Sequence, residues 1–170
     1  MEKILVSRCL LGEPVRYDGR GAPCRAPQLE QWRREGRLIA VCPELAGGLA
    51  CPRPPAEVQG ADGGAVLTGE ARVLTQSGQN LTDAFLRGAN AALDLCRQHG
   101  IRLALLKARS PSCGATDTYD GSFSGRLLPG VGVTAARLRR AGIQVFDEQQ
   151  LPNLAAALQA LEPGSTMRPC

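Results

Sequence analysis

The chain has 170 residues, of which 44% are hydrophobic and 21% charged, an ordinary composition for one globular domain with a buried core. Its formal net charge of +4, from 20 basic and 16 acidic residues, is small and spread along the chain, so nucleic acid is not an expected partner. No run approaches the ~18 apolar residues of a membrane span, and no secretory signal is visible. We therefore expect a single cytoplasmic domain at 1–162, monomeric or a small homo-oligomer, and a flexible tail at 163–170.

In the first half of the chain, two apolar runs typical of buried strands, 3–7 and 37–44, flank a short predicted helix at 26–37. The following segment, 45–64, is so dense in Gly and Pro that we expect irregular structure. Two strand-like pieces, AVLTG and ARVLT, occupy 65–75 and are expected to pair as a hairpin.

The second half begins with the strongest helical pattern, at 80–100. Asn80 or Thr82 can cap this helix and Gly100 can end it. The remaining predicted elements are a buried strand at 101–108, a loop at 120–130, a helix at 133–142, a strand at 143–148 and a terminal helix at 151–162.

Strands and helices thus alternate, and the strands are continuously apolar. This pattern indicates a parallel sheet covered on both faces. We expect an α/β fold, a three-layer α/β/α sandwich of Rossmann-like type with a mainly parallel sheet. No G-x-G-x-x-G turn follows the first strand, so the sequence does not support dinucleotide binding.

Cysteine is abundant for a cytoplasmic protein of this size, with seven residues. The number is odd, and the cytosol keeps thiols reduced, so a disulfide framework is a poor explanation. Cys96 falls within the predicted helix at 80–100, and Cys170 is the last residue; neither suggests a site.

Three other cysteines follow predicted strands. Cys9 comes directly after the first strand, Cys42 ends the second, and Cys113 lies in the loop after the third. Ligands of an open parallel sheet bind in the crevice at the carboxyl ends of its strands. We therefore expect these three thiols to converge on one crevice.

The chemistry of three converging thiols is open from spacing alone. A structural zinc site usually has four ligands and paired C-x-x-C spacing, which is missing, and the one histidine, His99, lies at the end of a predicted helix. A [4Fe–4S] cluster with one open iron suits three thiolates, and a Cys-Pro pair such as Cys42-Pro43 is familiar at such sites. A thiol nucleophile, or no joint site, are the remaining readings.

Three blocks around these cysteines carry a resemblance to a known family: ILVSRCLLGEPVRYDG, VCPELAGGLACPRPPAE and LLKARSPSCG. In this order they resemble the signature blocks of the thiouracil desulfidase (TudS) family, a bacterial family, and the resemblance spans about residues 3–147. It implies a desulfidase with a [4Fe–4S] cluster that binds the sulfur of a thiolated pyrimidine such as 2-thiouracil at an open iron and yields uracil and sulfide.

The resemblance also implies roles for single residues. The cluster ligands are Cys9, Cys42 and Cys113. Glu44 matches a residue assigned to proton transfer, and Ser110 and Ser112 match polar residues near substrate and cluster. From the residues alone, Glu44 has a rival role as a structural carboxylate paired with an arginine, and the serines as caps of the loop after the strand.

Four further side chains are candidates for the substrate side of the site. Tyr17 and Asp18 follow the first cysteine block and could line the pocket, although Asp18 also fits an Asx turn. Arg53 and Lys107 could anchor an anionic intermediate, or each could simply pair with a carboxylate.

The sequence departs from the family pattern at Arg8, where relatives carry the block SACLLG, and at Cys51, where they carry GLPTPRPP. We expect Cys51 to be a buried or bystander thiol, because free cysteine often behaves as a small hydrophobic residue. The alternative is that Cys51 is a fourth cluster ligand, which would favour a non-catalytic iron–sulfur or redox-sensing module. A cluster-free enzyme with Cys113 as nucleophile is the other alternative, but no histidine is placed to act as its base.

Overall fold

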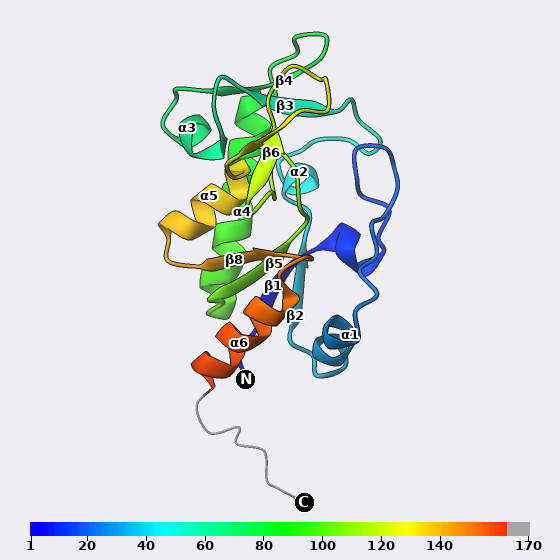
Figure 1. Ribbon diagram of the computed structural model, residues 1–170, viewed down its shortest axis with the longest axis vertical. Coiled ribbons are helices and arrows are strands. Elements are labelled where there is room, and N and C mark those ends of the chain that lie inside the picture. The colour runs from blue at the N-terminus through cyan, green and yellow to red at the C-terminus, as the bar shows by residue number, and fades with distance from the viewer. Residues whose placement is uncertain (163–170) are drawn as a thin grey trace, which may run out of the picture.

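The computed structural model describes residues 1–162, and its centre is a four-stranded parallel sheet in the order β2-β1-β5-β8 (Figure 1). The strands are β1 (Ile4–Ser7), β2 (Leu38–Val41), β5 (Leu103–Leu106) and β8 (Gln144–Asp147). In register, Ile4 of β1 lies between Leu38 and Leu103. The four predicted strands are thereby confirmed.

Helices cover both faces of this sheet. On one face, α4 (Thr82–His99) and α5 (Val133–Arg140) pack on side chains such as Leu5 and Leu106. On the other, α1 (Pro27–Arg34) and α6 (Leu151–Leu161) pack on Ile4 and Val6. β1 and β5 are buried throughout, as strands covered on both sides must be. The expected three-layer α/β/α sandwich is confirmed.

The C-terminal end of α4 follows the signal in the sequence, but its N-cap residue is Leu81, which makes no side-chain cap hydrogen bond, and not Asn80 or Thr82 as expected. Asn80 Oδ1 accepts the N–H of Thr82 at 3.0 Å, and Gly100 closes the helix with a φ of 64°, a left-handed conformation that glycine adopts without steric cost. Within residues 1–162, no helix is both long and apolar enough to cross a membrane. The tail expected at 163–170 lies outside the described residues.

The smaller elements differ from expectation. The Gly- and Pro-rich segment 45–64 is not wholly irregular, because it contains β3 (Ala56–Gln59). The hairpin predicted at 65–75 is wrong, since its first half belongs to the short helix α3 (Gly63–Leu67) and β4 (Arg72–Thr75) pairs antiparallel with β3 instead. Asp62 explains the helix: its carboxylate accepts the N–H groups of Gly64 and Ala65, a side-chain cap that favours a helical turn.

A second small hairpin was also missed. β6 (Asp117–Tyr119) pairs antiparallel with β7 (Leu127–Pro129), so the predicted loop at 120–130 is partly strand. Strands of three residues around a glycine-rich turn give almost no periodic signal. Two further short elements follow the first two strands of the sheet: the 3₁₀ helix η1 (Arg8–Leu11) and the helix α2 (Pro43–Ala46).

Two glycines bring α2 close to α4. A Cβ at Gly88 of α4 would lie 2.0 Å from the carbonyl oxygen of Pro43, and a Cβ at Gly47 would lie 2.0 Å from that of Ala84. Only glycine permits such backbone approach. This contact fixes the segment that carries Cys42 and Glu44.

Gly88→Ala should therefore destabilise the fold severely. The clash is with backbone rather than with a flexible side chain, so we expect a loss of roughly 3 kcal/mol or more in the free energy of unfolding, measured by urea denaturation. Asp94→Ala, at an exposed position of the same helix, is the control and should change stability by less than about 0.5 kcal/mol. A Gly88→Ala protein as stable as the parent would contradict the close approach.

Candidate functional site

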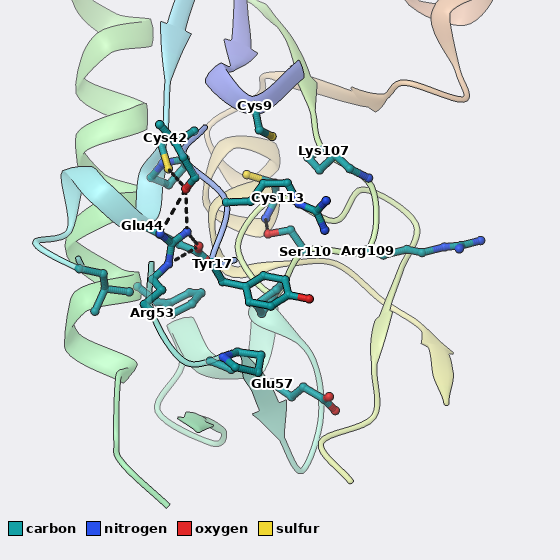
Figure 2. Close-up of a pocket in the computed structure, with 18 of the residues that line it drawn as sticks. Cys9, Tyr17, Cys42, Glu44, Arg53, Glu57, Lys107, Arg109, Ser110 and Cys113 are labelled. Atoms are coloured by element: carbon teal, nitrogen blue, oxygen red, sulfur yellow. Dashed lines mark hydrogen bonds and ion pairs between the residues drawn. The ribbon is translucent and has the colours of Figure 1, made fainter. Parts of the chain in front are cut away.

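Three cysteines meet at the carboxyl edge of the central sheet. Cys9 lies in η1 after β1, Cys42 lies between β2 and α2, and Cys113 lies in the loop after β5. The strands β2, β1 and β5 are neighbours, so the convergence expected from the sequence is present. All three residues line one cavity of about 570 Å³, with their sulfur atoms at one end of it (Figure 2).

The loop that carries Cys113 is held by hydrogen bonds and close packing. Ser110 Oγ accepts the N–H groups of Ser112 at 3.1 Å and of Cys113 at 3.0 Å. Arg109 has a φ of 64°, which turns the chain after β5. A Cβ at Gly114 would lie 2.8 Å from the carbonyl oxygen of Asp117, so glycine is required there.

Burial dominates the acidity of the three thiols. It raises the pKa of Cys113 to about 12, a shift that the hydrogen bond from Ser7 opposes. It raises the pKa of Cys9 to about 11, reinforced by the neighbouring Cys42. Burial also raises the pKa of Cys42, against the opposing effect of the backbone N–H of Leu45. At neutral pH these groups are thiols unless a metal centre displaces their protons.

Sulfur is the donor that this site offers. Within residues 1–162, no three Cys, His, Asp or Glu side chains are grouped to hold a single metal ion. The ligands of a four-iron cluster bind different iron atoms, so their sulfurs need not gather around one point. Two buried thiols, of Cys9 and Cys113, and the half-buried thiol of Cys42 around one cavity therefore fit an iron–sulfur cluster and leave one iron without a cysteine.

Ser7 links this site to the sheet and was missed in the sequence. It is the last residue of β1 and is 2% exposed. Its hydroxyl accepts the N–H of Lys107 at 3.0 Å and lies 3.5 Å from the sulfur of Cys113, to which it donates. A donor to a ligand sulfur tunes the ligand's basicity and orientation. Its position beside Cys9 was the available signal.

Glu44 lines the same cavity and forms an ion pair with Arg53 (Figure 2). Both Nε, at 3.0 Å, and Nη2 of Arg53 donate to Glu44 Oε2. The other three donor hydrogens reach the carbonyl oxygens of Val15 and Ala50. Since a guanidinium has five N–H donors, Arg53 is fully engaged with the protein, although it lines the cavity.

Lys107 and Tyr17 also line the cavity. The ammonium of Lys107 donates to Glu148 Oε1 at 2.7 Å and to the carbonyl oxygen of Ala108 at 3.2 Å, so one of its three donor hydrogens has no protein partner among these contacts. Glu148, which sequence reasoning did not identify, also accepts the N–H of Ala108 at 2.8 Å. Tyr17 is 41% exposed and projects into the open part of the cavity (Figure 2).

Two residues expected at the site do not line the cavity. Ser112 is 1% exposed, and its hydroxyl pairs with Thr134 at 2.7 Å. Asp18 is exposed, and its carboxylate accepts the N–H of Arg20 at 3.0 Å, which is the Asx turn that the Asp-Gly pair favours.

Cys51 is also outside the cavity lining. Its thiol is exposed and lies 3.3 Å from the carbonyl oxygens of Pro14 and Arg16. Cys9, Cys42 and Cys113 line the cavity, and Cys51 does not. The geometry therefore favours three cysteine ligands over four.

The fold and the donor set define an α/β protein of the class that holds an iron–sulfur cluster through cysteine. The family of 2-thiouracil desulfurases matches residues 4–150. The solved structure of the [4Fe–4S]-dependent thiouracil desulfidase TudS is 52% identical with a TM-score of 0.87, and the match covers 94% of this chain and 99% of that one. YbbK of Bacillus subtilis (strain 168), an uncharacterized protein, is 40% identical over 151 residues, which are 89% of this chain and 99% of that protein.

The chain therefore belongs to the 2-thiouracil desulfurase family. This confirms the resemblance seen in the three cysteine-bearing blocks. The match extends over the whole α/β domain and is not confined to those blocks.

The thiols should differ sharply in reactivity in the reduced, cluster-free chain. Alkylation requires the thiolate, so at pH 7.5 we expect iodoacetamide to modify exposed Cys51 at least ~100-fold faster than buried Cys113, as followed by peptide mass spectrometry. The labelling of Cys113 should accelerate as the pH rises toward its pKa of about 12. Labelling of Cys113 as fast as that of Cys51 at pH 7.5 would contradict this burial.

Proposed function

We propose that this protein is a [4Fe–4S]-dependent desulfidase that converts 2-thiouracil, or a closely similar thiolated pyrimidine, to the oxo compound and sulfide. The observation that carries the proposal is the convergence of three cysteine thiols and a paired glutamate on one cavity. The similarity to TudS over 94% of the chain supports it. Cys9, Cys42 and Cys113 would hold the cluster.

The bound cluster would supply an iron atom free of cysteine, a Lewis acid with affinity for the soft sulfur of a thiocarbonyl group. The overall exchange is balanced by water alone: C=S and H₂O give C=O and H₂S, with no net oxidation or reduction. The protein itself would orient the substrate ring, activate the attacking water and transfer protons during the exchange.

Glu44 is the general base in this proposal. Its Oε2 accepts both hydrogen bonds from Arg53. Among the hydrogen bonds of the site within residues 1–162, none is donated to Oε1. Oε1 can therefore accept the proton of the attacking water. Arg53 fixes the orientation of the carboxylate, and so acts as a positioning residue rather than a substrate anchor.

Ser110 and Lys107 complete the polar part of the cavity. Ser110 Oγ accepts two backbone N–H groups, which leaves its own proton free to donate to substrate or cluster. Lys107 keeps one ammonium hydrogen for an anionic group, since Glu148 and Ala108 take the other two. Tyr17 lies on the substrate side. Ser112 and Asp18 have structural roles in this proposal.

Glu44→Gln tests the base. The amide keeps the shape and can still pair with Arg53, but it cannot accept the proton of water. We expect kcat for sulfide release from 2-thiouracil to fall roughly 100-fold or more, with the iron content and the absorption near 400 nm unchanged after anaerobic reconstitution. Full activity would refute the base role, and loss of iron would show a structural role instead.

Cysteine variants test the ligand set. We expect Cys42→Ala to lose bound iron and all activity, because a cluster needs its thiolates, and Cys51→Ala to keep both. Iron and sulfide analysis of anaerobically prepared protein is the measurement. If Cys51→Ala lost the cluster, the non-catalytic four-thiolate module would be favoured. A parent protein that never binds iron would leave the cluster-free cysteine enzyme.

A further inference from the structure

The aromatic side chains of this protein are concentrated at the site. The chain contains only three Phe, two Tyr and one Trp. Four of these line the cavity, namely Tyr17, Phe85, Tyr119 and Phe123. The other two, Trp32 and Phe146, pack in the core on the α1 and α6 face of the sheet. Most of the few aromatic side chains of this protein therefore line one cavity. Such side chains suit the binding of a planar ring.

Phe123 differs from the other three in its backbone. It has a φ of 56°, in the left-handed region, which costs a bulky residue conformational energy. Within residues 1–162 the one other non-glycine residue with positive φ is Arg109, which also lines the cavity. Strained residues persist where the surrounding structure holds them, and they gather at functional sites.

The hydrogen bonds that hold Phe123 come from β3. Glu57 Oε1 accepts the N–H of Gly121 at 2.9 Å and that of Phe123 at 3.2 Å. Gln59 Nε2 donates to the carbonyl oxygen of Gly121 at 2.8 Å. Glu57 is 9% exposed, so its carboxylate is a nearly buried anchor for the loop between β6 and β7.

This anchor lies at the opposite end of the cavity from the thiols. Figure 2 shows Cys9, Cys42 and Cys113 at one end, Tyr17 between them and Glu57, and Glu57 at the other end. A substrate whose sulfur points to the cysteines would extend its ring toward the aromatic side chains. An acyclic thiocarbonyl compound would leave that part of the cavity to water.

We propose that Phe123, positioned by Glu57, is a specificity-determining residue that contacts the face of the substrate ring, so that the protein acts on planar heterocyclic thiocarbonyl compounds in preference to acyclic ones such as thiourea. This inference rests on the proposed desulfidase function and deepens it. In this proposal, the strained backbone at Phe123 serves to place its ring at the cavity.

Three variants of Phe123 test the proposal in the cluster-loaded enzyme. Phe123→Leu keeps an apolar side chain without a ring, Phe123→Tyr keeps the ring, and Phe123→Gly removes the side chain together with the conformational penalty. Sulfide release is measured with 2-thiouracil and with thiourea. Inhibition by uracil, which offers the ring without the reacting sulfur, reports ring binding alone.

For the parent we expect kcat/KM to be far higher with 2-thiouracil than with thiourea. The Leu and Gly substitutions should raise KM for 2-thiouracil and the inhibition constant of uracil about tenfold, within the range found for base–aromatic stacking. They should leave kcat, iron content and thiourea turnover nearly unchanged. The Tyr substitution should resemble the parent. Phe123→Gly should unfold at the same temperature as the parent or higher, because glycine tolerates positive φ.

Equal losses on both substrates, an unchanged KM for 2-thiouracil, or thiourea turnover matching that of 2-thiouracil in the parent would each overturn the proposal. A lower unfolding temperature for Phe123→Gly with unchanged KM would reduce Phe123 to a packing role.

If the parent releases no sulfide from any substrate, the desulfidase function fails first. Calorimetric binding of uracil to parent and Phe123→Leu then still tests the ring contact, and equal affinity for the two would overturn it.

The role of Glu57 has its own test. Glu57→Ala removes the acceptor of both loop N–H groups and should reproduce the rise in KM of Phe123→Leu with little change in kcat. Glu57→Gln keeps an acceptor oxygen and should restore the parent KM. Glu70→Ala, an exposed glutamate between β3 and β4, is the matched control and should have no effect. A Glu57→Ala enzyme with parent kinetics would overturn the positioning role.

Discussion

Parallel pairing of β2, β1 and β5 is the constraint on which the site depends. Parallel strands end at the same edge, and each of these three is followed by a segment that carries one cysteine. The segments are short and individually held: η1 follows β1 directly, α2 is seated on α4 through Gly47 and Gly88, and the Cys113 loop is fastened by Ser110. Moving any strand would separate the sulfurs.

The polar side chains around the three sulfurs are already bound to other groups of the protein. Ser7 donates to the sulfur of Cys113, Arg53 holds Glu44 and two carbonyl groups, and Lys107 is paired with Glu148. Because the protein already restrains each of these side chains, they lose little conformational entropy when substrate binds. The aromatic side chains then supply the surface that is not polar.

The sequence predicts the parts of this structure that repeat a strong pattern. The buried strands, α4 with its glycine end and the placement of three cysteines at strand ends could all be read from the chain. The hairpins β3-β4 and β6-β7 could not, because their strands have three or four residues and lie among Gly and Pro. The contacts of Ser7 with Cys113 and of Glu57 with the loop at Phe123 join distant segments, which a single sequence does not pair.

The spacing of the three thiols has a consequence for how the protein matures. In a zinc finger, neighbouring cysteines sit in one short motif that a metal can engage before the rest of the chain has folded. Here each thiol belongs to a different strand–loop unit, and Cys113 follows β5, the third of the strands to be synthesised among β1, β2 and β5. A cluster held by these three cysteines would therefore need a nearly finished domain, and its binding would report that the sheet has been assembled.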